Sequence, residues 1–106
     1  MEWIYLFLAG LLEIGWPLGL KLSQTTENKY AWIIFSAVCM IASGVMLYAA
    51  QRTIPMGTAY AIWTGIGAAG AFILGILIFK EPASAFRIIS VSLIVMGIIG
   101  LKLSNN

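Results

Sequence analysis

The stretch Gly57-Thr-Ala-Tyr-Ala-Ile-Trp-Thr-Gly-Ile-Gly67 opens a long apolar segment and decides the fold. It is rich in glycine and alanine, although each glycine in the helix of a soluble protein costs about 1 kcal/mol relative to alanine. In a lipid bilayer, small residues instead let helix backbones approach closely. Tyr60 and Trp63 stand three residues apart, on one helix face. We therefore interpret the stretch as part of a membrane-spanning helix whose aromatic face, with Thr64 and Gly67, lines a site.

The whole chain has the composition of a membrane protein. Of its 106 residues, 61% are hydrophobic and 9% are charged, whereas soluble domains contain about 25% charged residues. Four apolar stretches, 3–22, 31–51, 57–79 and 85–103, each approach the ~20 residues that cross a bilayer as a helix. Because short loops join them, consecutive helices must run in opposite directions. We predict an all-α integral membrane protein, with residues 1–106 forming a single up-and-down four-helix transmembrane domain.

The sequence also argues against several classes of function. With no histidine and one cysteine, Cys39, the chain lacks the ligands of a transition-metal or haem site, so we expect no metal and no cofactor. It has no nucleophile–base pair, no paired carboxylates and no glycine-rich phosphate loop, so we predict that it is not an enzyme. The six basic residues mark helix ends rather than one patch, which argues against nucleic acid as a partner.

The basic residues bear on membrane orientation as well. If both chain ends share one side, that side carries Arg52 and Lys102. The opposite side carries four basic residues: Lys21, Lys29, Lys80 and Arg87. Orientation follows the excess of Lys and Arg in short loops, and here the excess is small. We therefore expect that the chain inserts both ways round, with its basic side chains anchored at the membrane interfaces.

Glu13 is the only acidic residue deep inside a predicted span. A charge at the centre of a transmembrane helix costs about 2.5–3.5 kcal/mol on insertion scales, and such residues usually mark ion or proton pathways. A structural ion pair is the alternative, but every Lys and Arg lies near a span end or in a loop. The remaining partners are a proton, a bound cation, or donors such as Tyr60, Trp63 or Ser43. Because one carboxylate binds a proton or an organic cation but not both, Glu13 suits a proton/cation exchanger.

Aromatic and polar residues are predicted to surround this carboxylate. Trp16 shares the helix face of Glu13, where it either donates to the carboxylate, stacks on a planar cation or packs. Trp63 lies too deep for an interfacial aromatic belt, and its N–H, like the Tyr60 hydroxyl, needs a buried acceptor such as Glu13. Ser43 is ambiguous, because a serine inside a helix often bonds the carbonyl four residues earlier.

Proline and glycine positions predict local features of the backbone. Pro17 has no N–H, so the Glu13 carbonyl loses its helical partner and a kink is expected in the first span. Gly65 and Gly67 form either a hinge or a notch for close packing. Two glycines of the last span are assigned to packing between chains, in a homodimer: Gly97 and Gly100.

The sequence resembles the small multidrug resistance family. The resemblance rests on Gly10-x-x-Glu13-x-x-Trp16 and on Pro55-x-Gly-Thr-Ala-Tyr-Ala-Ile-Trp-Thr-Gly-Ile-Gly67, and it covers all four spans. The tryptophan at position 16, the Lys80-Glu81-Pro82 turn and the terminal Gly-Ile-Ile-Gly-Leu-Lys pattern look like the guanidinium-exporter subtype. By this resemblance we predict a proton-coupled antiporter that exports guanidinium-type small organic cations across the bacterial inner membrane.

The resemblance further implies an antiparallel homodimer in which two copies insert in opposite orientations. Two Glu13 residues would then face one shared site and bind either protons or one cation. In the exporter subtype a network of side chains holds the carboxylate, with a glycine close by. The matching positions in this sequence are Gly10, Trp16, Ser43, Tyr60 and Trp63.

One position departs from the subtype, which usually has a small residue such as alanine where this chain has Pro17. A bend there would widen the site, which favours a broader multidrug exporter of quaternary ammonium cations as an alternative. A second alternative is a non-transporting membrane subunit in which Glu13 contacts a basic residue of a partner. A pair of unlike chains is likewise an alternative to the homodimer.

Overall fold

The computed structural model describes residues 1–104 and consists of four helices. They are α1 (Glu2–Thr25), α2 (Lys29–Ala50), α3 (Met56–Phe79) and α4 (Ala85–Ser104). All four are long and apolar enough to cross a membrane, which confirms the predicted all-α fold with four spans. The largest difference from the expected bounds is at the end of α1, where the hydroxyl groups of Ser23 and Thr25 bond back to helix carbonyls and the helix continues past Leu22.

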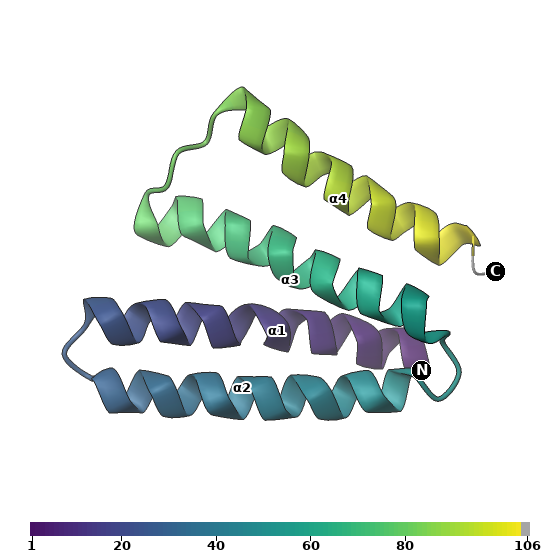
Figure 1. Cartoon of the computed structure of the whole chain (residues 1–106), viewed down its shortest axis with the longest axis horizontal. Coiled ribbons are helices and arrows are strands. Elements are labelled where there is room, and N and C mark those ends of the chain that lie inside the picture. The colour runs from purple at the N-terminus through teal and green to yellow at the C-terminus, as the bar shows by residue number, and fades with distance from the viewer. Residues whose placement is uncertain (105–106) are drawn as a thin grey trace.

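The helices lie side by side in the order α2, α1, α3, α4 (Figure 1). α1 packs against both α2 and α3, whereas α4 packs mainly on α3 and reaches α1 through Lys102, whose Nζ lies 4.5 Å from the centre of the Trp3 ring. The overall dimensions are 46 × 34 × 17 Å, so the chain is a flat layer of helices. The up-and-down order is as expected, but the four helices do not close around a common core. One chain by itself therefore leaves both faces of the layer open.

The buried core is small and joins α1, α2 and α3 near the end of the layer that carries the N-terminus. It consists of Leu6, Ala50, Ile54, Ala59 and Ile62. The alanines at positions 50 and 59 are fully buried, so the backbones there lie close together. Within α4, by contrast, no residue is buried. The apolar side chains of α4 are thus available to lipid or to another chain.

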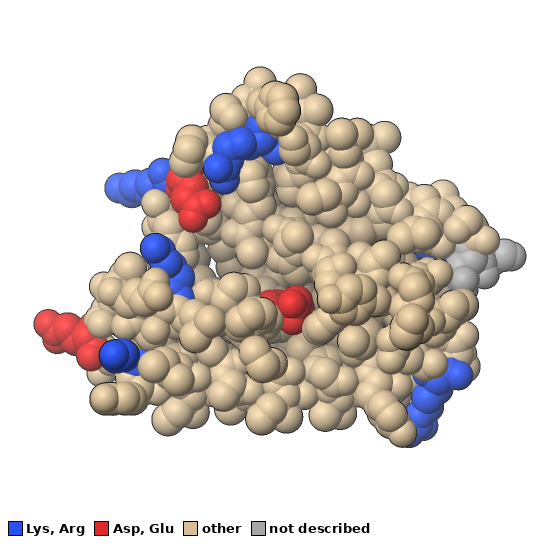
Figure 2. Space-filling model, viewed as in Figure 1, with Lys and Arg blue, Asp and Glu red and all other residues tan. Residues whose placement is uncertain are grey.

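Charged side chains gather at the two ends of the layer, and the surface between them is mostly apolar (Figure 2). Red atoms also lie near the middle of the face shown, in otherwise tan surroundings. The N-terminus and the last turn of α4 lie at the same end of the layer (Figure 1), as an even number of spans requires. This charge distribution fits helices that cross the bilayer along their length.

Pro17 does not interrupt α1, which runs continuously from Glu2 to Thr25. The proline leaves the Glu13 carbonyl without its helical N–H partner. At the neighbouring backbone position, the Ser36 hydroxyl of α2 donates to the Trp16 carbonyl over 2.8 Å. Packing against α2 thus supports α1 at the proline, and the expected kink does not break the helix.

Candidate functional site

Ser43 joins three helices at one buried point. Its Oγ donates to the Ala9 carbonyl of α1 over 2.6 Å and accepts a hydrogen bond from Trp63 Nε1 of α3 over 2.8 Å. Ser43 is 0% exposed, so both bonds lie away from solvent and lipid. The serine thus bonds a neighbouring helix rather than the preceding turn of its own.

Glu13 lies one turn after Ala9 on α1, with its partly buried side chain against α3. A Cβ atom at Gly67 would stand only 2.5 Å from Glu13 Cγ, so the glycine leaves the space that the side chain occupies. The ion pairs found within residues 1–104 belong to Glu2 and Glu81. No basic side chain of the described residues therefore forms an ion pair with the Glu13 carboxylate.

The two aromatic residues of α3 lie together, as their spacing predicted. The ring centroids of Tyr60 and Trp63 are 5.4 Å apart, at an angle of 53°. Trp63 is partly buried and donates to Ser43, so the expected hydrogen bond from its indole to Glu13 is not the one formed. Tyr60 is 56% exposed, which leaves its hydroxyl accessible on the open face of the layer.

Trp16 and Ser36 lie on the other side of Glu13. The Trp16 ring is partly buried, and within residues 1–104 its N–H has no hydrogen-bond acceptor. Sequence reasoning gave Ser36 no role, yet it is buried and binds the Trp16 carbonyl. The missed signal is its spacing of seven residues from Ser43, which is two helix turns on the same face. The two serines hold carbonyls of α1 on either side of Glu13.

The predicted supporting residues have packing roles in this structure. A Cβ atom at Gly10 would lie 2.7 Å from Ile66 Cβ, and one at Gly65 would lie 2.8 Å from Ile98 Cδ1. Gly10 thus lets α1 approach α3, and Gly65 lets α3 approach α4. The Thr64 hydroxyl donates to the Tyr60 carbonyl within its own helix, over 2.8 Å. A hinge at Gly65 and Gly67 stays a prediction.

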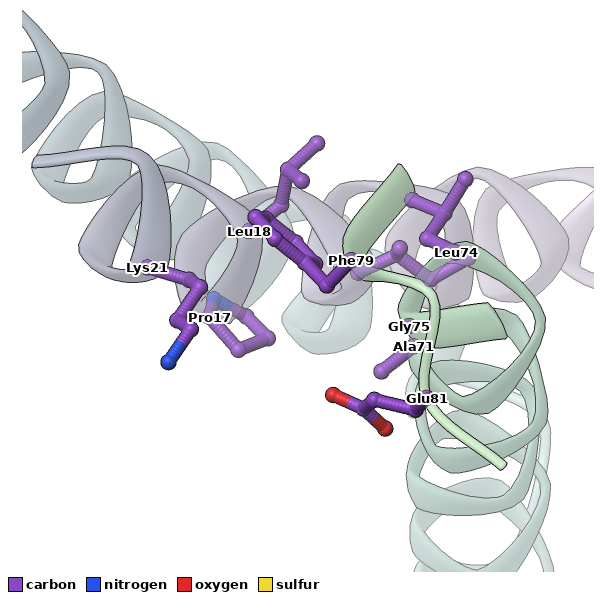
Figure 3. A pocket seen from close by; sticks show the side chains of 9 residues that line it. Pro17, Leu18, Lys21, Ala71, Leu74, Gly75, Phe79 and Glu81 are labelled. Atoms are coloured by element: carbon purple, nitrogen blue, oxygen red, sulfur yellow. The ribbon is translucent and has the colours of Figure 1, made fainter. Parts of the chain in front are cut away.

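The glycines assigned to packing between chains face open space. A Cβ atom at Gly97 or Gly100 would meet no atom of the described part of the chain within 4 Å. Both residues line a groove of about 520 Å³ between α3 and α4. Packing of a second chain at this groove stays a prediction. Pro17 lines a different cavity, between the ends of α1 and α3 (Figure 3).

These features define a class of protein: a small multi-span membrane protein with one accessible carboxylate halfway along a span. The chain belongs to the small multidrug resistance family. The sequence profile described as Small Multidrug Resistance protein matches residues 1–94. The resemblance seen in the sequence is thereby confirmed. The family and the four spans together make this chain a multi-pass integral protein of the inner membrane.

Full-length relatives support the same conclusion. The chain is 55% identical over 106 residues to a guanidinium exporter of Citrobacter freundii, and the alignment covers 100% of both chains. It is 49% identical over 105 residues to a guanidinium exporter of Proteus vulgaris, and this alignment covers 99% of this chain and 100% of the relative. A guanidinium exporter of Salmonella typhimurium strain LT2 is 53% identical over 104 residues, 98% of each chain. All three are named as exporters, which points to a transporter rather than an enzyme.

Proposed function

We propose that this protein exports guanidinium-type small organic cations in exchange for protons, with Glu13 binding the two in turn. The observation that carries the proposal is the Glu13 carboxylate, partly exposed near the middle of α1 and without an ion-pair partner among residues 1–104. The full-length likeness to proteins named as guanidinium exporters supports the choice of cation.

The chemistry of a carboxylate suits this substrate. A guanidinium ion is planar and donates parallel N–H bonds to both oxygens of a carboxylate. It also stacks on aromatic rings, and the partly exposed rings of Trp16 and Tyr60 are candidates for this contact. Because protonation removes the charge that binds the cation, the two ligands compete for Glu13. That competition couples cation movement to proton movement.

The hydrogen bonds of Ser43 give this site a fixed frame. They hold the α1 backbone one turn before Glu13 and the Trp63 ring of α3 in one arrangement. Ser36 holds α1 three residues after the carboxylate. These are positioning roles, since neither serine is proposed to bind the cation.

We also infer that two copies of the chain, inserted in opposite orientations, form the exporter. One chain is a layer 17 Å thick with its faces open, and Tyr60 is 56% exposed beside the site. A second copy would supply the missing wall. The small excess of basic residues on one side of the membrane permits both orientations.

Transport by purified protein in proteoliposomes tests the function. With an acidic interior, outward proton flow should drive uptake of radiolabelled guanidinium. Glu13→Gln should abolish that uptake, because the amide neither titrates nor carries charge. Glu2→Gln, a matched loss of charge at the helix end, should transport normally. Proton-driven uptake by Glu13→Gln would refute the mechanism, and a wild-type protein inactive with every cation would favour the non-transporting subunit.

Broader multidrug export is the second candidate. It depends on a bend at Pro17 that widens the site, whereas the full-length relatives are named as guanidinium exporters. We therefore expect tetraalkylammonium ions to compete poorly with guanidinium in the same uptake assay. Competition by tetraalkylammonium at concentrations similar to those of guanidinium would favour the multidrug alternative.

A further inference from the structure

A cavity of about 230 Å³ lies between the C-terminal ends of α1 and α3. Its walls are largely apolar, and they include Ile14, the neighbour of Glu13 in the sequence. Two charged side chains, Lys21 of α1 and Glu81 of the loop after α3, also line it. In Figure 3 the Glu81 carboxylate points toward the side of the cavity that carries Pro17 and Lys21.

This cavity continues the contact between α1 and α3 that contains Glu13. On α1, Pro17 follows Glu13 by one turn and Lys21 follows Pro17 by another. On α3, Gly75 lies eight residues beyond Gly67, the glycine that contacts Glu13. Eight residues of helix rise about 12 Å. The cavity therefore lies on the same seam as Glu13, between Ile14 and the membrane end, and Gly75 in its wall is about 12 Å along α3 from the Glu13 contact.

The backbone places Glu81 at this position. α3 ends at Phe79, and the next residue, Lys80, adopts the left-handed conformation with φ 56° and ψ 36° and turns the chain back. The Glu81 N–H then donates to the Gly75 carbonyl over 3.0 Å. A Cβ atom at Gly75 would stand 2.5 Å from Glu81 Oε1, so the carboxylate lies directly on the α3 backbone.

Glu81 already binds a guanidinium group, that of Arg87, but binds it loosely. Arg87 Nη2 lies 3.5 Å from Glu81 Oε1, whereas strong charge-assisted bonds measure about 2.7–2.9 Å and often form in pairs. The Arg87 guanidinium lies over the Phe72 ring, 5.0 Å from its centre. Its Nε atom is buried and has no hydrogen-bond partner among residues 1–104. A free guanidinium ion that approaches both carboxylate oxygens would make the better contact.

We propose that Glu81 is a peripheral receiving site, where a guanidinium-type cation displaces Arg87 before it moves along the seam to Glu13. This inference rests on the proposed function. Its electrostatics have a definite sign: Glu81 attracts the cation, whereas Lys21 at the same cavity repels it and Arg87 competes for the carboxylate. Charges that line such a cleft raise the local concentration of an oppositely charged substrate and are screened by salt.

The test measures the KM and maximal rate of guanidinium uptake at low and high ionic strength. Glu81→Gln should raise KM about threefold or more at low salt, with little change in the maximal rate and a smaller effect at high salt. Lys21→Gln and Arg87→Gln should both lower KM. Glu27→Gln, the same loss of charge in the exposed loop after α1, should leave KM unchanged.

The predicted changes in KM have opposite directions in Glu81→Gln and Arg87→Gln, and this difference distinguishes recruitment of the cation from a structural role. If the Glu81–Arg87 pair only fastens the loop to α4, Glu81→Gln and Arg87→Gln will shift KM in the same direction, and the proposal is overturned. Within residues 1–104 the Lys21 side chain makes no ion pair or hydrogen bond that Lys21→Gln would break. An unaltered KM in that variant therefore also counts against the proposal. An active wild type with an unchanged KM in Glu81→Gln refutes this inference alone, whereas an inactive wild type refutes the proposed function.

Discussion

Replacing Ser43 with alanine should destabilise the helix layer more than any other removal of a single hydroxyl. The hydroxyl donates to Ala9 of α1 and accepts from Trp63 of α3, so the variant loses two contacts between helices. Such bonds in membrane proteins contribute about 0.6 kcal/mol on average and up to about 1.7 kcal/mol. The Trp63 N–H would also lose its acceptor, and an unsatisfied buried donor costs about 1–3 kcal/mol. We therefore expect a loss of about 1–3 kcal/mol in the free energy of unfolding.

Unfolding in mild detergent micelles, driven by added sodium dodecyl sulfate and followed by circular dichroism, measures this loss. Ser36→Ala is the matched control. It removes a buried hydroxyl from the same face of α2, and this hydroxyl makes a single hydrogen bond, to the Trp16 carbonyl. Its loss should be about 0.6 kcal/mol. If Ser43→Ala unfolds at the same detergent fraction as Ser36→Ala, the two hydrogen bonds of Ser43 do not hold α1 and α3 together. Guanidinium uptake by Ser43→Ala should be slower but still coupled to protons, because Glu13 is intact.

Two glycine substitutions test the site and the assembly. Gly67→Ala should slow guanidinium uptake about tenfold or more, because a Cβ atom 2.5 Å from Glu13 Cγ must displace the carboxylate. Gly44→Ala is the control and should not slow uptake, because a Cβ atom there meets no described atom within 4 Å. Equal uptake rates for the two variants would contradict the close contact between Gly67 and Glu13. Gly97→Val should reduce cross-linking between two copies with little effect on the stability of the single chain, because a Cβ atom at Gly97 meets no atom of the described residues within 4 Å. Undiminished cross-linking would argue against a dimer contact at this groove.

The four helices could be predicted from the sequence because the signal for a membrane span is local. An apolar run of about 20 residues and the polar residues at its ends settle each span without any knowledge of its neighbours. Glu13 stands out in the sequence in the same local way, since a charge deep in an apolar span has few structural uses, and its role in binding stays a prediction. The end of α1 was less plain, because hydroxyl groups such as that of Thr25 extend a helix beyond its apolar run.

The partners of these residues could not be predicted, because they depend on how the helices rotate and pack. Trp63 was expected to bond Glu13, but the rotation of the packed helices places Ser43 of α2 at the indole N–H. Arg87 was read as an interface anchor from its position at a span end, whereas the turn at Lys80 brings Glu81 within 3.5 Å of it. A left-handed residue that is not glycine leaves little trace in a sequence, so this turn was not foreseeable.

Polar side chains inside the layer fall into two groups, those whose hydrogen bonds are formed within the chain and those without a partner in it. The hydroxyls of Ser36, Ser43 and Thr64 each donate to a helix carbonyl, so their hydrogen-bonding capacity is met within the chain. Within residues 1–104, the Glu13 carboxylate and the Tyr60 hydroxyl have no such partner, although both lie in spans where polar groups need one. Both are also accessible from outside the chain. What satisfies them must come from outside, as a proton, a cation or a side chain of another chain, and the proposed carrier uses the first two in turn.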